Sequence, residues 1–158
     1  MKKMKINFWK YCLEVLKDCK VISKFQLFAY CLMGNHVHLL LKIQKEKLEQ
    51  IFKRIGARFV YWYNWKYERS GHLFQDRFRS EPIDDDGYLL TVVRYIHMNP
   101  VKAGICKNVS SYKFSSYTEY VSPHNGQLTD IDFVIGLLPQ NEFAEFHNKN
   151  AEDKCLEL

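Results

Sequence analysis

Two histidines separated by one residue are the first side chains in the sequence that could bind a metal. His36 and His38 flank Val37 in a segment that alternates like a β-strand, so both side chains project from the same face. Side chains about 7 Å apart at their bases can chelate one divalent ion. The same spacing also fits two polar residues on a half-exposed sheet face, so the pair alone leaves both interpretations open.

A tyrosine and an asparagine farther along the chain could complete such a site. Tyr95 and Asn99 are four residues apart, which places a phenol and an amide on one face of a predicted helix. A phenol is mostly protonated at neutral pH, so its attack on a phosphate needs a base or a nearby cation. The alternative is that Tyr95 is a core aromatic residue and that Asn99 ends a helix ahead of Pro100.

Hydrophobic periodicity predicts the elements that would position these residues. The expected helices cover residues 8–19, 45–67 and 84–100. The expected strands cover residues 25–33, 36–42 and 73–80. A tight turn at Gly34-Asn35 joins the first two strands, and the third helix begins at an acidic cap and is stopped by Pro100. This order predicts an α+β fold, an antiparallel sheet covered by helices on one side.

Basic side chains gather in the middle of the chain. From Lys42 to Arg79 ten basic residues face four acidic ones, whereas from Glu119 to the end eight acidic residues face two basic ones. Phosphate backbones are the commonest partner of a basic face. An ordinary solvated helix face would explain the same charges equally well.

Three spaced motifs together resemble the single-strand DNA transposases that have an HUH motif and one catalytic tyrosine, the REP-associated branch in particular. The motifs are FAYCLMGNHVHLLLK at 28–42, GHLFQDRF at 71–78 and YIHMNPVKAG at 95–104. The segment Ser115-Ser116-Tyr117 is similar to one that follows the catalytic helix of that family. The resemblance extends in order over residues 25 to 121, and three motifs agree by chance far more rarely than one.

The resemblance implies a role for each of the four candidate residues. It makes His36 and His38 the metal-binding pair, Tyr95 the nucleophile and Asn99 the third ligand, with Mg²⁺ or Mn²⁺ as the metal. In that family the tyrosine attacks a phosphodiester of single-stranded DNA next to a hairpin, forming a 5′-phosphotyrosine and freeing a 3′-hydroxyl. The candidate DNA-binding residues are Lys53, Arg54, Arg58, Arg77 and Arg79.

The chain departs from the family pattern at its first strand. Members begin with a strand that carries Tyr-His-Val, and no such segment precedes the first helix here. In a ferredoxin-like sheet of order 4-1-3-2 that strand is central, so the histidine strand would lack one neighbour and the strand of Arg77 would be detached. We expect a truncated transposase-like domain at 1–121 and a helical, acidic extension at 122–158. The sheet would re-pair through a second chain as a homodimer, or the chain would be a catalytically inactive remnant that binds DNA hairpins.

Other classes of protein fit the sequence poorly. The cysteines are scattered without a C-x-x-C pair, which indicates reduced thiols in a cytoplasmic protein: Cys12, Cys19, Cys31, Cys106 and Cys155. Neither a signal peptide nor an apolar run long enough to span a membrane is present. A hydrolytic metalloenzyme built on the histidine pair is a further alternative, but the remaining histidines are dispersed, at His72, His97, His124 and His147.

Overall fold

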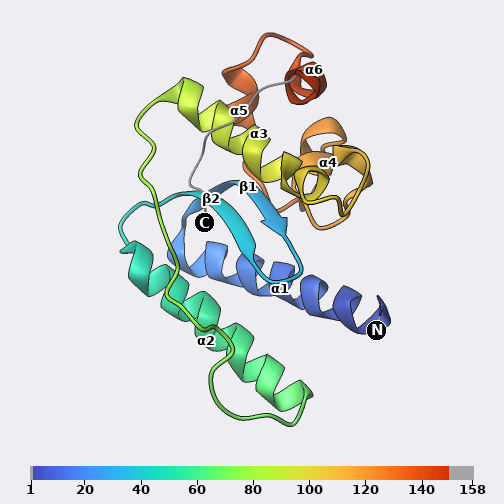
Figure 1. Ribbon diagram of the computed structural model, residues 1–158. Coiled ribbons are helices and arrows are strands. Elements are labelled where there is room, and N and C mark those ends of the chain that lie inside the picture. Colours follow the sequence, from blue (N-terminus) through green and yellow to red (C-terminus); the bar gives the residue numbers. More distant parts are fainter. Residues whose placement is uncertain (1, 150–158) are drawn as a thin grey trace. The chain divides into compact units, whose positions relative to one another are not determined.

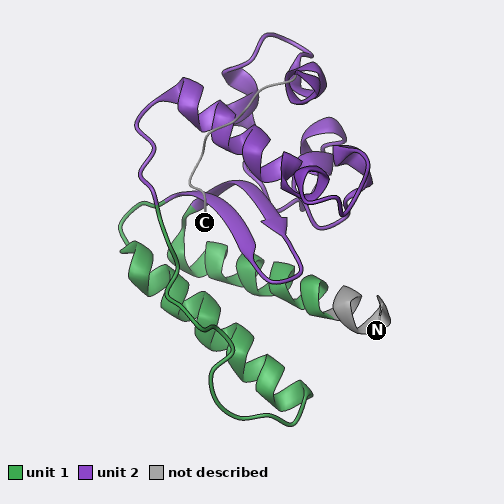
Figure 2. Ribbon diagram, viewed as in Figure 1, with its two compact units in different colours: residues 1–25, 43–80 green, residues 26–42, 81–158 purple. Residues whose placement is uncertain are grey.

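The computed structural model describes residues 2–149, which form two compact units (Figures 1 and 2). Among the described residues, the first unit comprises 2–25 and 43–80, and the second comprises 26–42 and 81–149. The elements, in chain order, are α1 (Lys2–Ser23), β1 (Gln26–Leu32), β2 (Val37–Lys42), α2 (Leu48–Lys66), α3 (Asp86–Lys102), the 3₁₀ helix η1 (Val109–Ser111), α4 (Tyr117–Val121), α5 (Asp132–Gly136) and α6 (Phe143–Asn148). The C-terminal part of the predicted acidic extension, residues 150–158, lies outside the described residues.

The first unit is a pair of helices held together by aromatic rings. Tyr11 of α1 stacks on Trp62 of α2 with ring centroids 4.1 Å apart, and Phe8 meets Phe59 edge to face at 4.8 Å. Such ring pairs add stability beyond the area that they bury. Both helices were predicted, and α1 extends beyond the expected residues 8–19 in both directions.

The prediction of a third strand at residues 73–80 was wrong. This segment has neither strand nor helix structure and is mostly exposed. A strand is stable only beside another strand, and the described residues provide no partner here, so alternation alone does not suffice. The aromatic residues of the segment pack on α2 instead: the ring of Phe78 stacks on Phe52 at 4.2 Å, and that of Phe74 lies 6.0 Å from Phe59.

The second unit is built on a β-hairpin, as predicted. Its turn is closed by the Met33 amide, which donates to the carbonyl of His36 at 2.8 Å across Gly34-Asn35. In the described chain β1 and β2 form a two-stranded antiparallel sheet, with Cys31 opposite His38. The other edge of β1 pairs with residues 114–116 through two backbone hydrogen bonds of 2.8 and 3.0 Å. The α+β class is therefore confirmed, with fewer strands than expected.

Helix α3 begins at the acidic cap that the sequence predicts. Asp85 is the N-cap residue, and its carboxylate accepts a hydrogen bond from the Tyr88 amide at 2.7 Å. The side chain thereby satisfies one of the amide groups that have no partner in the first turn. Asp86, in the first turn, also has the charge that the helix dipole favours there.

The end of α3 differs from the prediction. Pro100 does not stop the helix, which continues to Lys102. A proline in the last turn removes a single amide donor, and packing compensates for that loss because Pro100 is buried. The helix ends at Gly104, where φ is +69° and the Ile105 amide donates to the Pro100 carbonyl at 2.9 Å, a Schellman closure.

The core of the second unit joins the hairpin, α3 and the short helices that follow (Figure 1). Val93 and Ile96 of α3 pack with Ala29, Cys31 and Leu40 of the sheet. Because β1 is buried along its length and α3 packs on the hairpin, the residues of β2 and α3 that face each other are fixed by both backbones. None of the helices in the part of the chain that is described is long and apolar enough to cross a membrane.

Candidate functional site

His38 lies at the centre of the candidate site, on the buried face of β2. Along β2, His38 and Leu40 are buried while Val37 is exposed, as the predicted alternation requires. The His38 ring meets the Tyr95 ring edge to face with centroids 5.9 Å apart, and it meets the His36 ring in the same manner at 4.8 Å. The structure therefore brings together His36 and His38 of the hairpin and Tyr95 of α3.

One ring nitrogen of His38 is unused. His38 is only 9% exposed, and its Nε2 atom has no hydrogen-bond partner among the described residues. A buried polar atom without a partner is costly, and such atoms in folded proteins require an explanation. Burial lowers the pKa of His38 to about 4, with the neighbouring His36 contributing. The ring is neutral at pH 7, which is the form that binds a metal ion.

His36 is exposed, immediately before β2, and is oriented by its neighbour. Its Nδ1 atom lies 2.6 Å from the side-chain oxygen of Asn35. An amide oxygen can only accept, so the neutral ring carries its hydrogen on Nδ1 and keeps a lone pair on Nε2. Hydrogen bonding at one nitrogen in this way commonly fixes the tautomer of a metal-binding histidine.

Tyr95 and Asn99 are half-buried on successive turns of α3. The amide nitrogen of Asn99 donates to the backbone carbonyl of Tyr95 at 3.2 Å. The ammonium group of Lys102 lies over the Tyr95 ring, 5.4 Å from its centroid. The helix thus places a phenol, an amide and a cation along one side, and the ring of the phenol lies beside His38.

The residues that could hold a metal are few in the described part of the chain. No group of three or more histidine, cysteine, aspartate or glutamate side chains gathers there into a metal site. The donor set is therefore limited to the two imidazoles, with the amide oxygen of Asn99 as a further candidate. The unused Nε2 atom of His38 fits such a group, because a metal ion would satisfy this buried nitrogen in the tautomer whose hydrogen is on Nδ1.

The five predicted DNA-binding residues differ in their surroundings. Lys53, Arg77 and Arg79 are exposed, and none of them forms an ion pair with a described residue. Arg58 is also exposed and lies 3.3 Å from Asp18 of α1. All five belong to the first unit, whereas the histidines and Tyr95 belong to the second.

Arg54 is the exception, because its guanidinium is held by other residues. Two of its nitrogens donate to the two carboxylate oxygens of Glu46 at 2.6 Å, and one also donates to the hydroxyl of Ser23. Hydrogen bonds from Arg54 and Ser23 lower the pKa of Glu46 to about 2. A bidentate pair of this kind fixes the guanidinium, so Arg54 joins α1, α2 and the segment just before α2, all within the first unit, rather than presenting its charge to a ligand.

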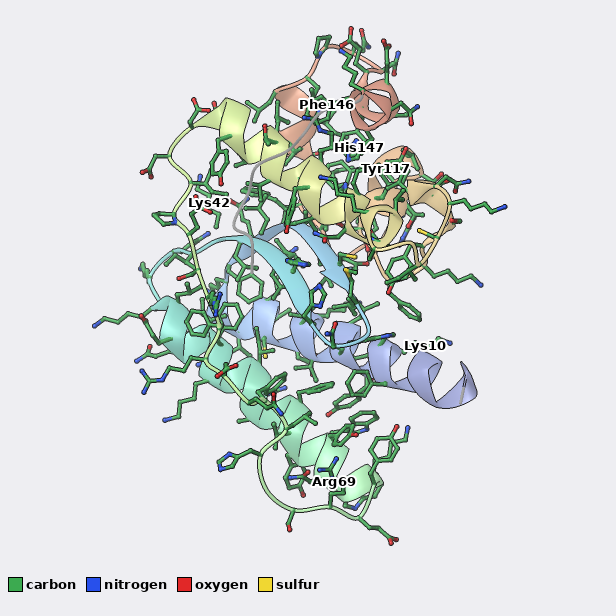
Figure 3. All side chains as sticks on the ribbon, in the orientation of Figure 1. Lys10, Lys42, Arg69, Tyr117, Phe146 and His147 are labelled. Atoms are coloured by element: carbon green, nitrogen blue, oxygen red, sulfur yellow. The ribbon has the colours of Figure 1, made fainter. Side chains whose placement is uncertain are left out.

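A second histidine pair was missed by the sequence analysis, which treated His97 and His147 as dispersed. Nδ1 of His97 lies 2.9 Å from Nε2 of His147, and the rings stack (the label of His147 in Figure 3 marks the place). His97 Nε2 lies 2.7 Å from the Ser116 hydroxyl, and His147 Nδ1 lies 2.9 Å from the Phe143 carbonyl. No spacing rule links residues 50 positions apart, so no signal in one sequence could have found this pair.

The hydrogen bonds of this second pair fix both tautomers. A carbonyl only accepts, so His147 carries its hydrogen on Nδ1 and accepts at Nε2 from the Nδ1–H of His97. His97 Nε2 then accepts from the hydroxyl of Ser116. Burial, with His147 contributing, holds the pKa of His97 well below its ordinary value. Every ring nitrogen is satisfied, and the pair joins α3, the helix of Tyr95, to α4 and α6.

Comparisons with known proteins identify the family of the chain. The family model described as Transposase IS200 like matches residues 2–99. A curated Haemophilus influenzae protein named as a REP-associated tyrosine transposase is 30% identical over 105 residues, and the match spans 59% of each protein. A solved structure of a REP-associated tyrosine transposase bound to a REP hairpin shares the fold, with a TM-score of 0.64, 20% identity, and coverage of 82% of this chain and 78% of that one. The chain belongs to the IS200-like transposase family.

Proposed function

We propose that this chain is a metal-dependent enzyme that nicks and rejoins single-stranded DNA beside a hairpin, with Tyr95 as its nucleophile. The observation that carries the proposal is the buried, unused Nε2 atom of His38, whose ring lies 5.9 Å from that of Tyr95. A relative of the same fold is described as bound to a REP hairpin, which supports hairpin DNA as the substrate class.

The Tyr95 hydroxyl would attack one phosphorus atom of the DNA backbone. Its oxygen forms a phosphoester with the 5′ side of the break, while the bond from phosphorus to the 3′ oxygen is cleaved. The phenol loses its proton to solvent, and the departing 3′ oxygen gains one. The number of phosphoester bonds is unchanged, so a 3′-hydroxyl of another strand can reverse the step without a nucleotide or a water molecule being consumed.

His36 and His38 would hold the Mg²⁺ or Mn²⁺ ion through their Nε2 atoms, and the amide oxygen of Asn99 is the third ligand that we propose. A bound divalent ion polarises a phosphate and stabilises the charge that develops on it. Neighbouring side chains orient the two imidazoles. The hydrogen bond from His36 to Asn35 orients the first imidazole, and packing against Tyr95 orients the second.

Lys53, Arg77 and Arg79, which are exposed on the first unit, are the residues that we propose for binding the DNA backbone. Arg58 would take part after leaving Asp18, an exposed pair that contributes little to stability. Arg54 would act indirectly, because its guanidinium holds Glu46.

The test is the formation of a covalent protein–DNA adduct. The native chain is incubated with Mn²⁺ and end-labelled oligonucleotides that have a hairpin and a single-stranded flank, and the products are separated under denaturing conditions. We expect a labelled protein band with the native chain and with Tyr88→Phe, a control from the same helix whose hydroxyl bonds to Glu81 at 3.0 Å. Tyr95→Phe should give no band.

The same assay separates the two versions of the function. A native chain that binds the hairpin but forms no adduct would be a DNA-binding remnant, and the proposed chemistry would be wrong. An adduct that survives Tyr95→Phe would show that another residue is the nucleophile.

A further inference from the structure

A cavity of about 300 Å³ lies beside the helix that carries Tyr95, within the second unit. Its walls come from α3, from the segment around η1 and from the end of α6 (the label of Phe146 in Figure 3 marks α6). None of the four residues of the candidate reaction site, His36, His38, Tyr95 and Asn99, lines this cavity. Its volume is at the lower end of the range for small-ligand sites and would accommodate one nucleotide.

All of the charged side chains that line the cavity are basic. They are Arg94, Lys102, Lys107 and Lys149, and no carboxylate is among the lining residues. The apolar part of the lining includes Met98 and Val109. A lining that combines basic and apolar side chains suits a ligand that has an anionic group and a flat apolar one.

Arg94 shapes the cavity. It is buried, its guanidinium lies 4.4 Å from the ring centroid of Phe146, and it donates to the Phe146 carbonyl at 3.3 Å. These contacts attach α6 to α3. The three lysines, in contrast, are exposed, so their ammonium groups can reach a ligand in the cavity.

Lys102 links the cavity to the candidate nucleophile. Its ammonium lies 5.4 Å from the centroid of the Tyr95 ring, and the same side chain lines the cavity. Met98 follows Tyr95 by three residues and therefore lies on the adjacent part of the helix surface. The side chain that lies over Tyr95 therefore also lines the cavity, which connects the cavity to the strand that Tyr95 would attack.

We propose that the cavity binds a nucleotide of the single strand that Tyr95 attacks, holding its phosphate with Lys102, Lys107 and Lys149. This inference rests on the proposed function for the identity of its ligand. It adds a binding site that belongs to the second unit alone and is separate from the basic residues of the first.

Methionine methyl groups offer a local probe of binding. Met98 lines the cavity, whereas Met33 is buried elsewhere in the same unit. The full chain, labelled with ¹³C at the methionine methyls, is titrated with a 5′-phosphorylated thymidine dinucleotide in EDTA. We expect the Met98 signal to shift and the Met33 signal to stay, and we expect the unphosphorylated dinucleotide to have much less effect.

Charge removal then tests the lysines. We expect the affinity for the phosphorylated dinucleotide to fall at least threefold in each of three variants, Lys102→Gln, Lys107→Gln and Lys149→Gln. Lys113→Gln, an exposed lysine of the same unit that does not line the cavity, is the matched control and should bind like the native chain. For a longer single strand, each pocket substitution should lower the slope of log affinity against log salt by about 0.7.

Three results would overturn the inference: no shift at Met98, an equal shift with the unphosphorylated dinucleotide, or an equal loss of affinity in Lys113→Gln. The experiment contains no metal and needs no cleavage. A native chain that binds the dinucleotide at Met98 but forms no covalent adduct would support the cavity as a binding site and contradict Tyr95 as the nucleophile. A chain that forms the adduct at Tyr95 but shows no shift at Met98 would support the nucleophile and contradict the binding site.

Discussion

The second unit contains two histidine pairs that use their ring nitrogens differently. His97 and His147 are 50 positions apart, and their nitrogens bond to each other at 2.9 Å and to a hydroxyl and a carbonyl on the outer sides. His36 and His38 are two positions apart, at the start of β2, with their ring centroids 4.8 Å apart, and Nε2 of His38 has no partner in the described chain. The difference teaches that a buried histidine indicates function when one of its nitrogens is left unused, and indicates structure when both are satisfied.

Electrostatics alone would not separate the two pairs. Burial lowers the pKa of His38 to about 4 and holds that of His97 well below its ordinary value, and a neighbouring histidine contributes in both cases. Perturbed pKa values are common at functional sites, but structural networks produce them as well. Hydrogen-bond satisfaction is therefore the more informative property here.

The largest predicted effect is a difference in stability between two variants, in which one histidine of each pair is replaced by leucine. His97→Leu removes two buried hydrogen bonds, the one to His147 and the one to the Ser116 hydroxyl, and we expect the free energy of unfolding to fall by about 3 kcal/mol. His38→Leu removes an atom that already lacks a partner, and stability should stay the same or rise by about 1 kcal/mol. Urea denaturation at pH 7.5 without metal measures both.

Equal losses of stability in His97→Leu and His38→Leu would contradict this distinction between the two histidine pairs. Such a result would mean that His38 has a structural role like that of His97, and the unused nitrogen would no longer be evidence for a ligand.

Affinity for Mn²⁺ should depend on His36 and His38, the pair on which stability does not depend. We expect His36→Ala and His38→Leu each to weaken Mn²⁺ binding at least tenfold in calorimetric titrations, because each removes one imidazole from a small donor set. Asn99→Ala should have a weaker effect, because a water molecule can replace a single oxygen ligand of Mn²⁺ or Mg²⁺. His124→Ala, at an exposed histidine in the same unit, is the control and should bind as the native chain does. Unchanged affinity in both histidine variants would refute the ligand assignment.

Acidification should lower the free energy of unfolding through His97 and His147, the pair whose ring nitrogens are all hydrogen-bonded. The pKa of His97 is lower in the folded chain than its ordinary value of 6.5, so the stability that the neutral ring contributes is complete above pH 6.5 and is lost as the pH falls below it. The groups that face His97 are His147 of α6 and the rings of Tyr117 and Tyr120 of α4, and burial raises the pKa of both tyrosines.

We therefore expect the free energy of unfolding to decrease by about 1 kcal/mol for each pH unit below 6.5 through His97 alone. The measurement compares urea denaturation of the native chain and of His97→Leu between pH 7.5 and 5.5. Parallel pH dependence in the two proteins would contradict this origin.

The smallest expected effect concerns the first unit. There the Arg54 side chain is held by hydrogen bonds within the protein, whereas the Lys53 side chain is exposed. Arg54→Gln breaks the bidentate pair with Glu46 and should lower the urea midpoint. Lys53→Gln should leave that midpoint unchanged and reduce the salt slope of hairpin binding by about 0.9, the value for one phosphate contact in a duplex. If Arg54→Gln changes the salt slope and not the midpoint, the pairing with Glu46 does not describe its role.

The sequence predicted the elements whose signals are local. The alternation around His38, the turn at Gly34-Asn35 and the acidic start of α3 each depend on a few adjacent residues, and the structure has all three. The failures involve partners that are distant in the chain. Phe74 and Phe78 alternate like a strand but have no strand to pair with among the described residues, and they pack on α2.

The candidate site shows the same limit. The spacing of His36 and His38 and that of Tyr95 and Asn99 could be seen in the sequence, and the resemblance to a family joined the two segments. Their proximity depends on the packing of α3 on the hairpin, which involves residues far apart in the chain. The ion pair of Arg54 with Glu46 and the bond from His97 to His147 could not be predicted, because side-chain partners across elements leave no periodic pattern.

The central claim is that the unused nitrogen of His38 marks the reaction site and that Tyr95 is its nucleophile. The most direct measurement is mass spectrometry of the protein after reaction with Mn²⁺ and a hairpin oligonucleotide, followed by nuclease digestion and sequencing of the modified peptide. The account predicts a nucleotide attached to Tyr95 in the native chain and no modified peptide in His38→Leu. A nucleotide on another residue, or unchanged modification in His38→Leu, would contradict it.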